Sequence, residues 1–354
     1  MSKINKTKTA GIVIETLATF LSISLIIFFL LYLADANFSE AIRGFIKSSI
    51  GGRKNAYLFT TFSKMALITG MAIAALIAFR AGLFNIGGEG QLVVGGLVSA
   101  FVGLSVADFG LYGILLALAS GMAAGAIWAL LSGFLTIYMG VPLLVGSLLL
   151  NYPARYISSY LVSHPFRDIN SGLPQTFLLP KSVWLPYFQG TRLDVGIILI
   201  ILVYLFILVI SQKTKYGYYS KSMGISFSFA KISGLPTKKI VFQTLALSGA
   251  IAGLVGSIAV LGIHHRFTDG MLVQPLYAWT GIIAALMVNL NLWGIPLAGF
   301  FFAAISTGAA GMERIAQVPK EIATIIQAII ILFVVGKLGS LGSASISNGK
   351  SDHD

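Results

Sequence analysis

The residues of this sequence that could do chemistry at membrane depth lie between positions 79 and 91. Asn85, Glu89 and Gln91 stand there among glycines, in the run Phe-Arg-Ala-Gly-Leu-Phe-Asn-Ile-Gly-Gly-Glu-Gly-Gln. Glycine lets a chain leave the helical path, and polar side chains can then satisfy the freed backbone groups or face a wet cavity. The pattern predicts a broken or re-entrant segment.

Glu89 is the acid of this segment, and an acid at membrane depth is a functional candidate. It either contacts a solute directly, or it caps a helix N-terminus or pairs with Arg80. We favour the second, structural role. Lys64 also falls within an apolar stretch, and its long side chain can reach the membrane surface.

Residues that could support catalysis or metal binding are few. The chain has no cysteine and four histidines, and it contains no His-Glu-x-x-His pair. The cluster His264-His265-Arg266 with Asp269 is typical of a solvated turn or a partner contact. Gly349-Lys350-Ser351 ends like a nucleotide-binding loop, but Ala344 stands where the first glycine must be. We expect no catalytic residue, no metal site and no cofactor bound by this chain.

The elements that must position these residues are membrane helices. Hydrophobic residues make up 56% of the chain, charged residues only 10%, and the mean hydropathy is +0.89. Soluble domains carry roughly 25% charged residues. Because about 20 apolar residues cross a bilayer, the sequence predicts an all-α polytopic membrane protein of about ten transmembrane helices. They are expected at 11–33, 57–78, 86–105, 111–139, 141–162, 193–212, 240–263, 276–292, 294–311 and 320–337.

Charge sets the expected orientation. The net charge is +12, which the membrane-insertion rule and anionic lipid explain without nucleic-acid binding. Residues 213–239 hold six lysines and no acid, so this segment is predicted to be cytoplasmic, together with both termini. The loop 34–56 is predicted to be external although it is rich in basic residues.

The chain divides into three predicted parts: an N-terminal helix and external connector over 1–56, a permease transmembrane domain over 57–338, and a disordered tail over 339–354. The longest external loop, 163–191, contains four prolines together with Trp184 and Tyr187. It is either a docking surface or a proline-rich connector with interfacial aromatics.

The cytoplasmic segment contains a short amphipathic stretch over 220–234 that cannot span a membrane. Such a helix either lies on lipid or enters a groove on a partner. The residues that could make such a contact are Lys221, Met223, Gly224, Phe227, Phe229, Lys231 and Gly234.

Four stretches resemble one family in order. The run from Arg80 to Gln91 resembles the signature of permeases from nucleoside and simple-sugar ABC importers, which group with the ribose and branched-chain amino-acid permeases. Residues 140–152, 216–236 and 247–256 resemble three further blocks, so the similarity spans about 57–338. The family usually places acids in the coupling segment and after Gly140, and this chain lacks them, which indicates a divergent member.

The resemblance implies a type II importer fold, in which two such permeases form one translocation path. It also implies a separate ABC ATPase that holds ATP and Mg²⁺, a substrate-binding lipoprotein outside, and insertion of the coupling segment into the ATPase. Separately from the resemblance, an odd number of predicted spans divides helices 2–5 from helices 7–10, so any repeat between these two groups would be inverted. Candidate path-lining or break-stabilising residues are Asn85, Glu89, Gln91, Asn151, Asn289 and Asn291.

The expected solute is small and neutral. The signature favours a nucleoside, with riboflavin or a simple sugar as alternatives. An ion-coupled secondary transporter is the other class, but it would normally need several intramembrane acids, and the predicted spans 111–139, 240–263, 276–292 and 294–311 have none.

Overall fold

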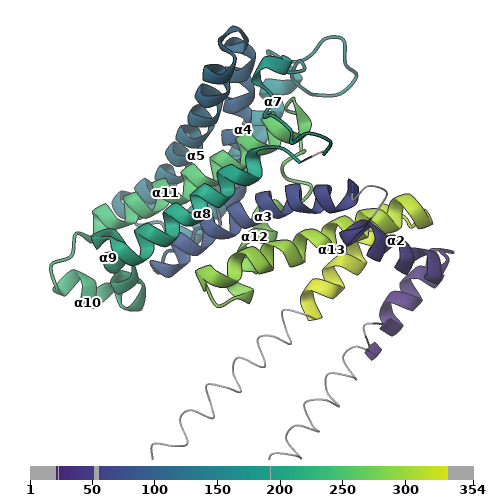
Figure 1. The fold of residues 1–354 in the computed structure, drawn as a ribbon. Helices are drawn as coiled ribbons and strands as arrows, with labels where there is room; N and C mark the ends of the chain where they lie inside the picture. The colour runs from purple at the N-terminus through teal and green to yellow at the C-terminus, as the bar shows by residue number, and fades with distance from the viewer. Residues whose placement is uncertain (1–20, 23, 52–55, 192, 334–354) are drawn as a thin grey trace, which may run out of the picture. The chain divides into compact units, whose positions relative to one another are not determined.

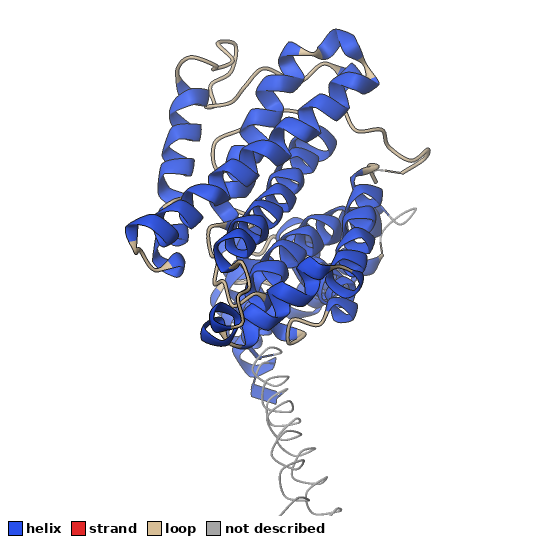
Figure 2. Cartoon of the chain, turned by 90° about the vertical axis from the view of Figure 1, so that its left-hand side faces the viewer, coloured by secondary structure: helices blue, strands red, loops and turns tan. Residues whose placement is uncertain are grey.

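A computed structural model describes residues 21–333 except 23, 52–55 and 192. The predicted tail over 339–354 and residues 11–20 and 23 of the first predicted span lie outside the described residues. Within those residues the chain is helical, with loops and no strand (Figure 2). Two isolated antiparallel bridges join Gln175 to Thr268 and Tyr187 to Asp194.

Most helices follow one another with short connections, but a long loop, 164–195, joins α7 to α8. The α-helices are α2 (Phe38–Ile50), α3 (Ala56–Arg80), α4 (Gly88–Ser105), α5 (Leu111–Met139), α6 (Leu143–Leu149), α7 (Asn151–Ser163), α8 (Gly196–Lys213), α9 (Lys215–Ile225), α10 (Phe227–Ile232), α11 (Thr237–Ile258), α12 (Tyr277–Met287) and α13 (Ile295–Ala316). Short turns η2 (Ala107–Phe109), η3 (Lys181–Val183), η4 (Ala259–His264) and η5 (Leu292–Gly294) complete the set. Helical residues also cover 320–333.

Six described helices are long and apolar enough to cross a membrane, and the bent pair Ser24–Leu33 and Phe38–Ile50 would make a seventh. The expectation of ten helices is therefore not confirmed. The predicted span 276–292 contains only α12, an apolar helix of 11 residues. The predicted span 141–162 is split into α6 and α7, because Pro153 cannot sit inside a continuous helix but fits the first turn of a new one.

The chain forms two compact units, residues 1–61 with 301–354, and residues 62–300. The predicted division at 56 and 338 stays a prediction. In the first unit α2 packs on the end of α13, where Gly44 lies against Gly311. The Ser49 hydroxyl donates to the Ala304 carbonyl at 3.0 Å, and the Thr61 hydroxyl donates to the Ser49 carbonyl at 2.7 Å.

The core of the second unit is built by α4, α5 and α11, which pack against one another (Figure 1). Glycines line their contacts: Gly253 of α11 lies against the Gly121 carbonyl and the Gly125 Cα, and Gly95 of α4 lies against Gly253. Without side chains between them, the backbones approach closely and gain van der Waals contact, which is how helices associate in lipid.

Replacing Gly253 by Val tests this packing. The new side chain would collide with the Gly121 carbonyl, so we expect the helices to separate and the stability to fall by about 1–3 kcal/mol. Gly172→Ala is the control, because no atom lies within 4 Å of a Cβ built at Gly172. Thermal melting in detergent measures both. Equal melting temperatures for Gly253→Val and the wild type would contradict the packing.

Candidate functional site

The predicted break between helices is confirmed. Helix α3 ends at Arg80 and α4 begins at Gly88, with non-helical chain between them. Gly82 turns the chain with a φ of +74°, which favours glycine. Gly88 then lies against Met71, about two and a half turns before the end of α3. The connection therefore runs back alongside α3, so that α4 starts deep in the bundle.

Asn85 satisfies polar groups within this connection. Its Oδ1 accepts from the Gly87 amide at 3.1 Å and from Gln91 Nε2 at 3.2 Å. Its Nδ2 donates to the Ser248 hydroxyl at 3.2 Å, and that hydroxyl donates to the Ala74 carbonyl of α3 at 2.8 Å. One side chain thus ties the break to both α3 and α11.

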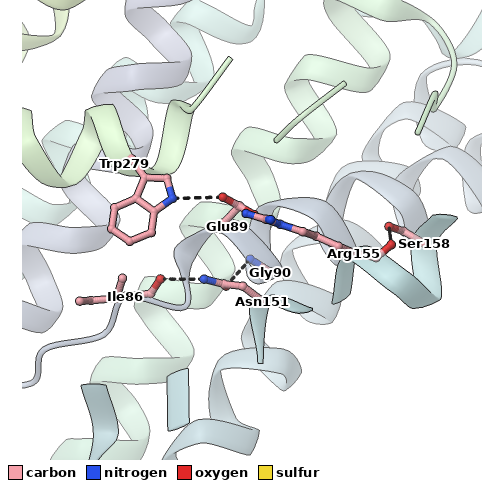
Figure 3. A network of polar contacts seen from close by, with 7 residues as sticks. All are labelled: Ile86, Glu89, Gly90, Asn151, Arg155, Ser158 and Trp279. Carbon is pink, nitrogen blue, oxygen red and sulfur yellow. Dashed lines mark hydrogen bonds and ion pairs between the residues drawn. The ribbon is translucent and has the colours of Figure 1, made fainter. Parts of the chain in front are cut away.

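Asn151, the first residue of α7, performs a similar task from the other side. Its Nδ2 donates to the Ile86 carbonyl at 3.2 Å, and its Oδ1 accepts from the Gly90 amide at 2.8 Å (Figure 3). The Ile86 amide donates to the Ser147 hydroxyl of α6 at 3.1 Å. The split of the predicted span into α6 and α7 therefore places two polar side chains against the break.

Glu89 is held by two partners that point toward it from different helices (Figure 3). Arg155 of α7 forms an ion pair with Oε1, and Trp279 Nε1 of α12 donates to Oε2 at 3.2 Å. Glu89 lies in the first turn of α4, as predicted for a helix N-terminus. The predicted pairing with Arg80 is wrong, because Arg80 donates instead to the Leu290 carbonyl and to the Ser211 hydroxyl.

The residues of this site differ in how much of each side chain is exposed. Asn85, Glu89, Gln91 and Asn151 are each at most 3% exposed, whereas the Arg155 side chain is 38% exposed and Trp279 is 36% exposed. Asn85 and Asn151 bond backbone groups, whereas Gln91 donates to Asn85 and its Oε1 has no partner among the described residues. Arg155 and Trp279 are the residues through which the buried carboxylate reaches an open surface.

The sequence argument missed Arg155 and Trp279. An arginine inside the predicted span 141–162 was the available signal, since a charge at membrane depth needs a partner and Glu89 was the candidate acid. Trp279 carried no such signal, because a tryptophan in an apolar stretch is ordinary.

Asn289 and Asn291 are not part of this site. They lie in the turn after α12, on a cavity beside Arg80 and α9. Asn289 and Leu290 adopt left-handed φ values of 50° and 56°, and Asn291 Oδ1 caps η5 by accepting from the Trp293 amide. These two asparagines therefore lie apart from the break, and their place on a translocation path stays a prediction.

The predicted coupling stretch forms two helices, α9 and α10, at the ends of α8 and α11 (Figure 1). The Ser226 hydroxyl caps α10 by accepting from the Phe229 amide, and Gly234 ends the segment with a φ of +74°. Phe227 and Phe229 are 51% and 65% exposed. We call the exposed surface of α9 and α10, which includes Phe227 and Phe229, the α9–α10 face.

Met223 and Gly224 contact other parts of this same chain. Met223 is buried in an apolar cluster with Phe79 and Leu245, so its expected contact with a partner is wrong. Gly224 lies directly on the Arg80 carbonyl, where any side chain would collide. These two residues dock α9 on the end of α3, whereas Lys221 and Lys231 are exposed.

The long loop after α7 is tied to the turn after η4. The Trp184 ring stacks on His265 with centroids 3.7 Å apart, and the Tyr187 hydroxyl lies 2.9 Å from His265 Nε2. The Ser159 hydroxyl donates to Asp269 Oδ2 at 2.9 Å. Burial lowers the pKa of His265, partly offset by its contact with the Leu261 carbonyl. The histidine cluster is thus packed against the loop rather than forming a simple solvated turn.

The arrangement of helices around a buried polar break defines a polytopic helical membrane protein, and comparison with known proteins gives its family. The family described as "Branched-chain amino acid transport system / permease component" matches residues 57–335. This chain therefore belongs to that family of permeases. As the resemblance predicted, it is the permease of an ABC importer, embedded in the membrane, and a transport subunit rather than an enzyme.

Three relatives illustrate the range of the family. The guanosine ABC transporter permease of Bacillus subtilis is 30% identical, over 76% of this chain and 77% of the relative. The glucose ABC transporter permease of Haloferax volcanii is 28% identical, over 74% and 72%. The nucleoside ABC transporter permease of Lactococcus lactis is 26% identical, over 78% and 78%.

The ion pair between Glu89 and Arg155 can be tested by charge removal. Arg155→Met would leave a buried carboxylate without its cation, and we expect a loss of about 1–3 kcal/mol, below the 3–5 kcal/mol of a fully buried pair because Arg155 is partly exposed. Glu89→Gln in the Arg155→Met background removes that charge while keeping an acceptor for Trp279, so stability should recover. Thermal melting of the four combinations measures the coupling, and a double variant that is no more stable than Arg155→Met contradicts it.

Asp194 precedes α8 and provides a pH-dependent test. Its carboxylate is buried and accepts from the Gly196 amide at 2.7 Å. Burial raises its pKa above 3.8, partly offset by backbone hydrogen bonds. The folded protein then holds the proton more tightly than the unfolded chain, so ionisation destabilises the fold as pH rises from 3.8 through the raised pKa.

Asp194→Asn should therefore melt at a higher temperature than the wild type at neutral pH, and the difference should vanish below pH 3.8. Asp194→Ala is the companion variant, because it leaves the Gly196 amide unsatisfied at a cost of about 1–3 kcal/mol. A lower melting temperature for Asp194→Asn at neutral pH would mean that the charge stabilises the fold.

Proposed function

We propose that this permease imports a nucleoside. Two of the three relatives described above carry nucleoside or guanosine in their names, including the one at 30% identity. Glucose appears in the third name, so a simple sugar is the competing solute.

In this proposal a second permease subunit completes the path, and a separate ATPase holds ATP and Mg²⁺. A substrate-binding lipoprotein delivers the nucleoside to the long loop after α7. The α9–α10 face lies in the cytoplasm, because its lysines stand without an acid between residues 195 and 268. Both termini are then cytoplasmic as well.

The exposed Phe227 and Phe229 are the proposed contacts with the ATPase. Two large apolar side chains that remain exposed on a short helix suit insertion into a groove. Closure of the ATPase on ATP would move α10, and through Gly224 and Met223 the movement would reach the end of α3. The end of α3 leads directly to the break.

The solute can be tested in proteoliposomes that contain the permease, its partner subunits and the binding protein. We expect ATP-dependent uptake of labelled guanosine, and unlabelled nucleosides should compete whereas glucose and riboflavin should not. Uptake that proceeds without ATP would contradict the importer mechanism. Uptake competed by glucose alone would contradict the nucleoside.

The contact with the ATPase can be tested by Phe229→Ala. Burial of a phenylalanine side chain contributes about 1.5–3 kcal/mol, so its loss should weaken ATPase binding by roughly tenfold or more. Lys231→Ala should change binding less, since an exposed ion pair contributes about 0–1 kcal/mol. Phe109→Ala is the matched control, because Phe109 is 63% exposed but lies in η2, away from the α9–α10 face. Co-purification that is unchanged by Phe229→Ala and Phe227→Ala would place these side chains on lipid.

A further inference from the structure

A cavity of about 520 Å³ opens beside the α9–α10 face. Its walls come from the ends of α3 and α8, from α9, and from the turn that joins α12 to η5. Phe227 and Phe229 do not line it. The cavity is therefore separate from the proposed ATPase contact and from the buried site around Glu89.

The charges that face this cavity are all positive. Arg80 and Lys221 line it, together with the amides Gln212 and Asn289, and none of its lining residues is an acid. Lys221 makes no hydrogen bond or ion pair with any described residue. A cavity with two cations and no acid is complementary to an anion.

Arg80 is held in place by strained backbone. Its Nε donates to the Leu290 carbonyl at 2.8 Å, and its Nη1 donates to the Ser211 hydroxyl at 3.2 Å. Leu290 and Asn289 both have positive φ, a conformation that costs about 1–3 kcal/mol per residue and gathers at ligand-binding sites. The guanidinium is thus pre-organised toward the cavity with donors to spare.

The cavity lies where the spans end. Arg80 is the last residue of α3, and Ser211 and Gln212 fall in the last turn of α8. Trp293, which is 69% exposed, lines it as well, and exposed tryptophan is typical of the membrane surface. Beyond the cavity, α8 presents the exposed apolar side chains Phe206 and Val209. The cavity therefore borders, through Ser211 and Gln212, a helix that also carries exposed apolar side chains.

We propose that this cavity binds the phosphodiester headgroup of an anionic phospholipid, with its acyl chains along α8. Arg80 and Lys221 contact the phosphate, and Trp293 lies at the headgroup beside them. A phospholipid fits both halves of the surface, the cationic cavity and the apolar helix, whereas a soluble phosphate or an acidic protein segment would use only the first. The inference is independent of the solute and of the ATPase contact.

Trp293 provides the reporter for the test. The full-length permease, without its partners, is placed in nanodiscs that contain either brominated phosphatidylglycerol or the same fraction of brominated phosphatidylcholine. The fluorescence of Trp293 is obtained by subtracting the emission of Trp293→Phe from the emission of the wild type. We expect several-fold stronger quenching by phosphatidylglycerol, and Lys221→Ala should reduce the preference by about fivefold, the effect of one cation at an anionic surface.

Lys239→Ala is the matched control, since Lys239 is also exposed at the start of α11 but does not line the cavity. It should leave the lipid preference unchanged. Native mass spectrometry of each variant should show retained phosphatidylglycerol for the wild type and Lys239→Ala, and less for Lys221→Ala, while equal melting temperatures establish that all variants are folded.

Three results would overturn the proposal. Equal quenching by the two lipids would mean that the cavity has no preference for anionic headgroups. If Lys221→Ala and Lys239→Ala lost the phosphatidylglycerol preference equally, the preference would come from the general charge of the surface and not from this cavity. Removal of the phosphatidylglycerol preference by added inorganic phosphate would make the cavity a soluble-anion site.

Discussion

Backbone amides and carbonyls inside a bilayer have no water to bind, and the connection between α3 and α4 exposes several of them at depth. The structure depends on how these groups are satisfied. Side chains bond these groups: Asn85 accepts from one backbone amide, and Asn151 bonds one amide and one carbonyl. Ser147 accepts from a further amide. Each asparagine both donates and accepts. An unsatisfied buried group costs about 1–3 kcal/mol, so loss of either asparagine side chain would destabilise the break.

The remaining architecture brings those partners to the break. Close contact of glycines between α4, α5 and α11 places Ser248 of α11 beside Asn85. The interruption between α6 and α7 places Asn151 and Arg155 on the opposite side, and α12 contributes Trp279. On the α9–α10 side, Gly224 lies on the last turn of α3, the helix that leads to the same break.

Local sequence patterns predicted the parts of this fold that depend on local chemistry. The span 111–139 matches α5, and the glycine-rich break lies where it was expected. Local patterns could not predict which residues pair across the fold. Glu89 pairs with Arg155, and not with the nearby Arg80, because α7 folds back over α4. Met223 was misassigned for the same reason, since the face of α9 that packs on α3 depends on Gly82 and Gly224 meeting. The expectation of ten spans is not confirmed, and one predicted span, 141–162, is divided into α6 and α7 near Pro153.

The central claim is that the buried amides hold the break together rather than line an aqueous path. Hydrogen exchange of the backbone amides of Ile86, Gly87 and Gly90 tests it most directly, because each donates to a side chain named above. The account predicts that these three amides, in lipid nanodiscs, exchange as slowly as the helical amides in the middle of α4. Exchange as fast as that of the exposed loop around Gly172 would show that water reaches the break, and would contradict the account.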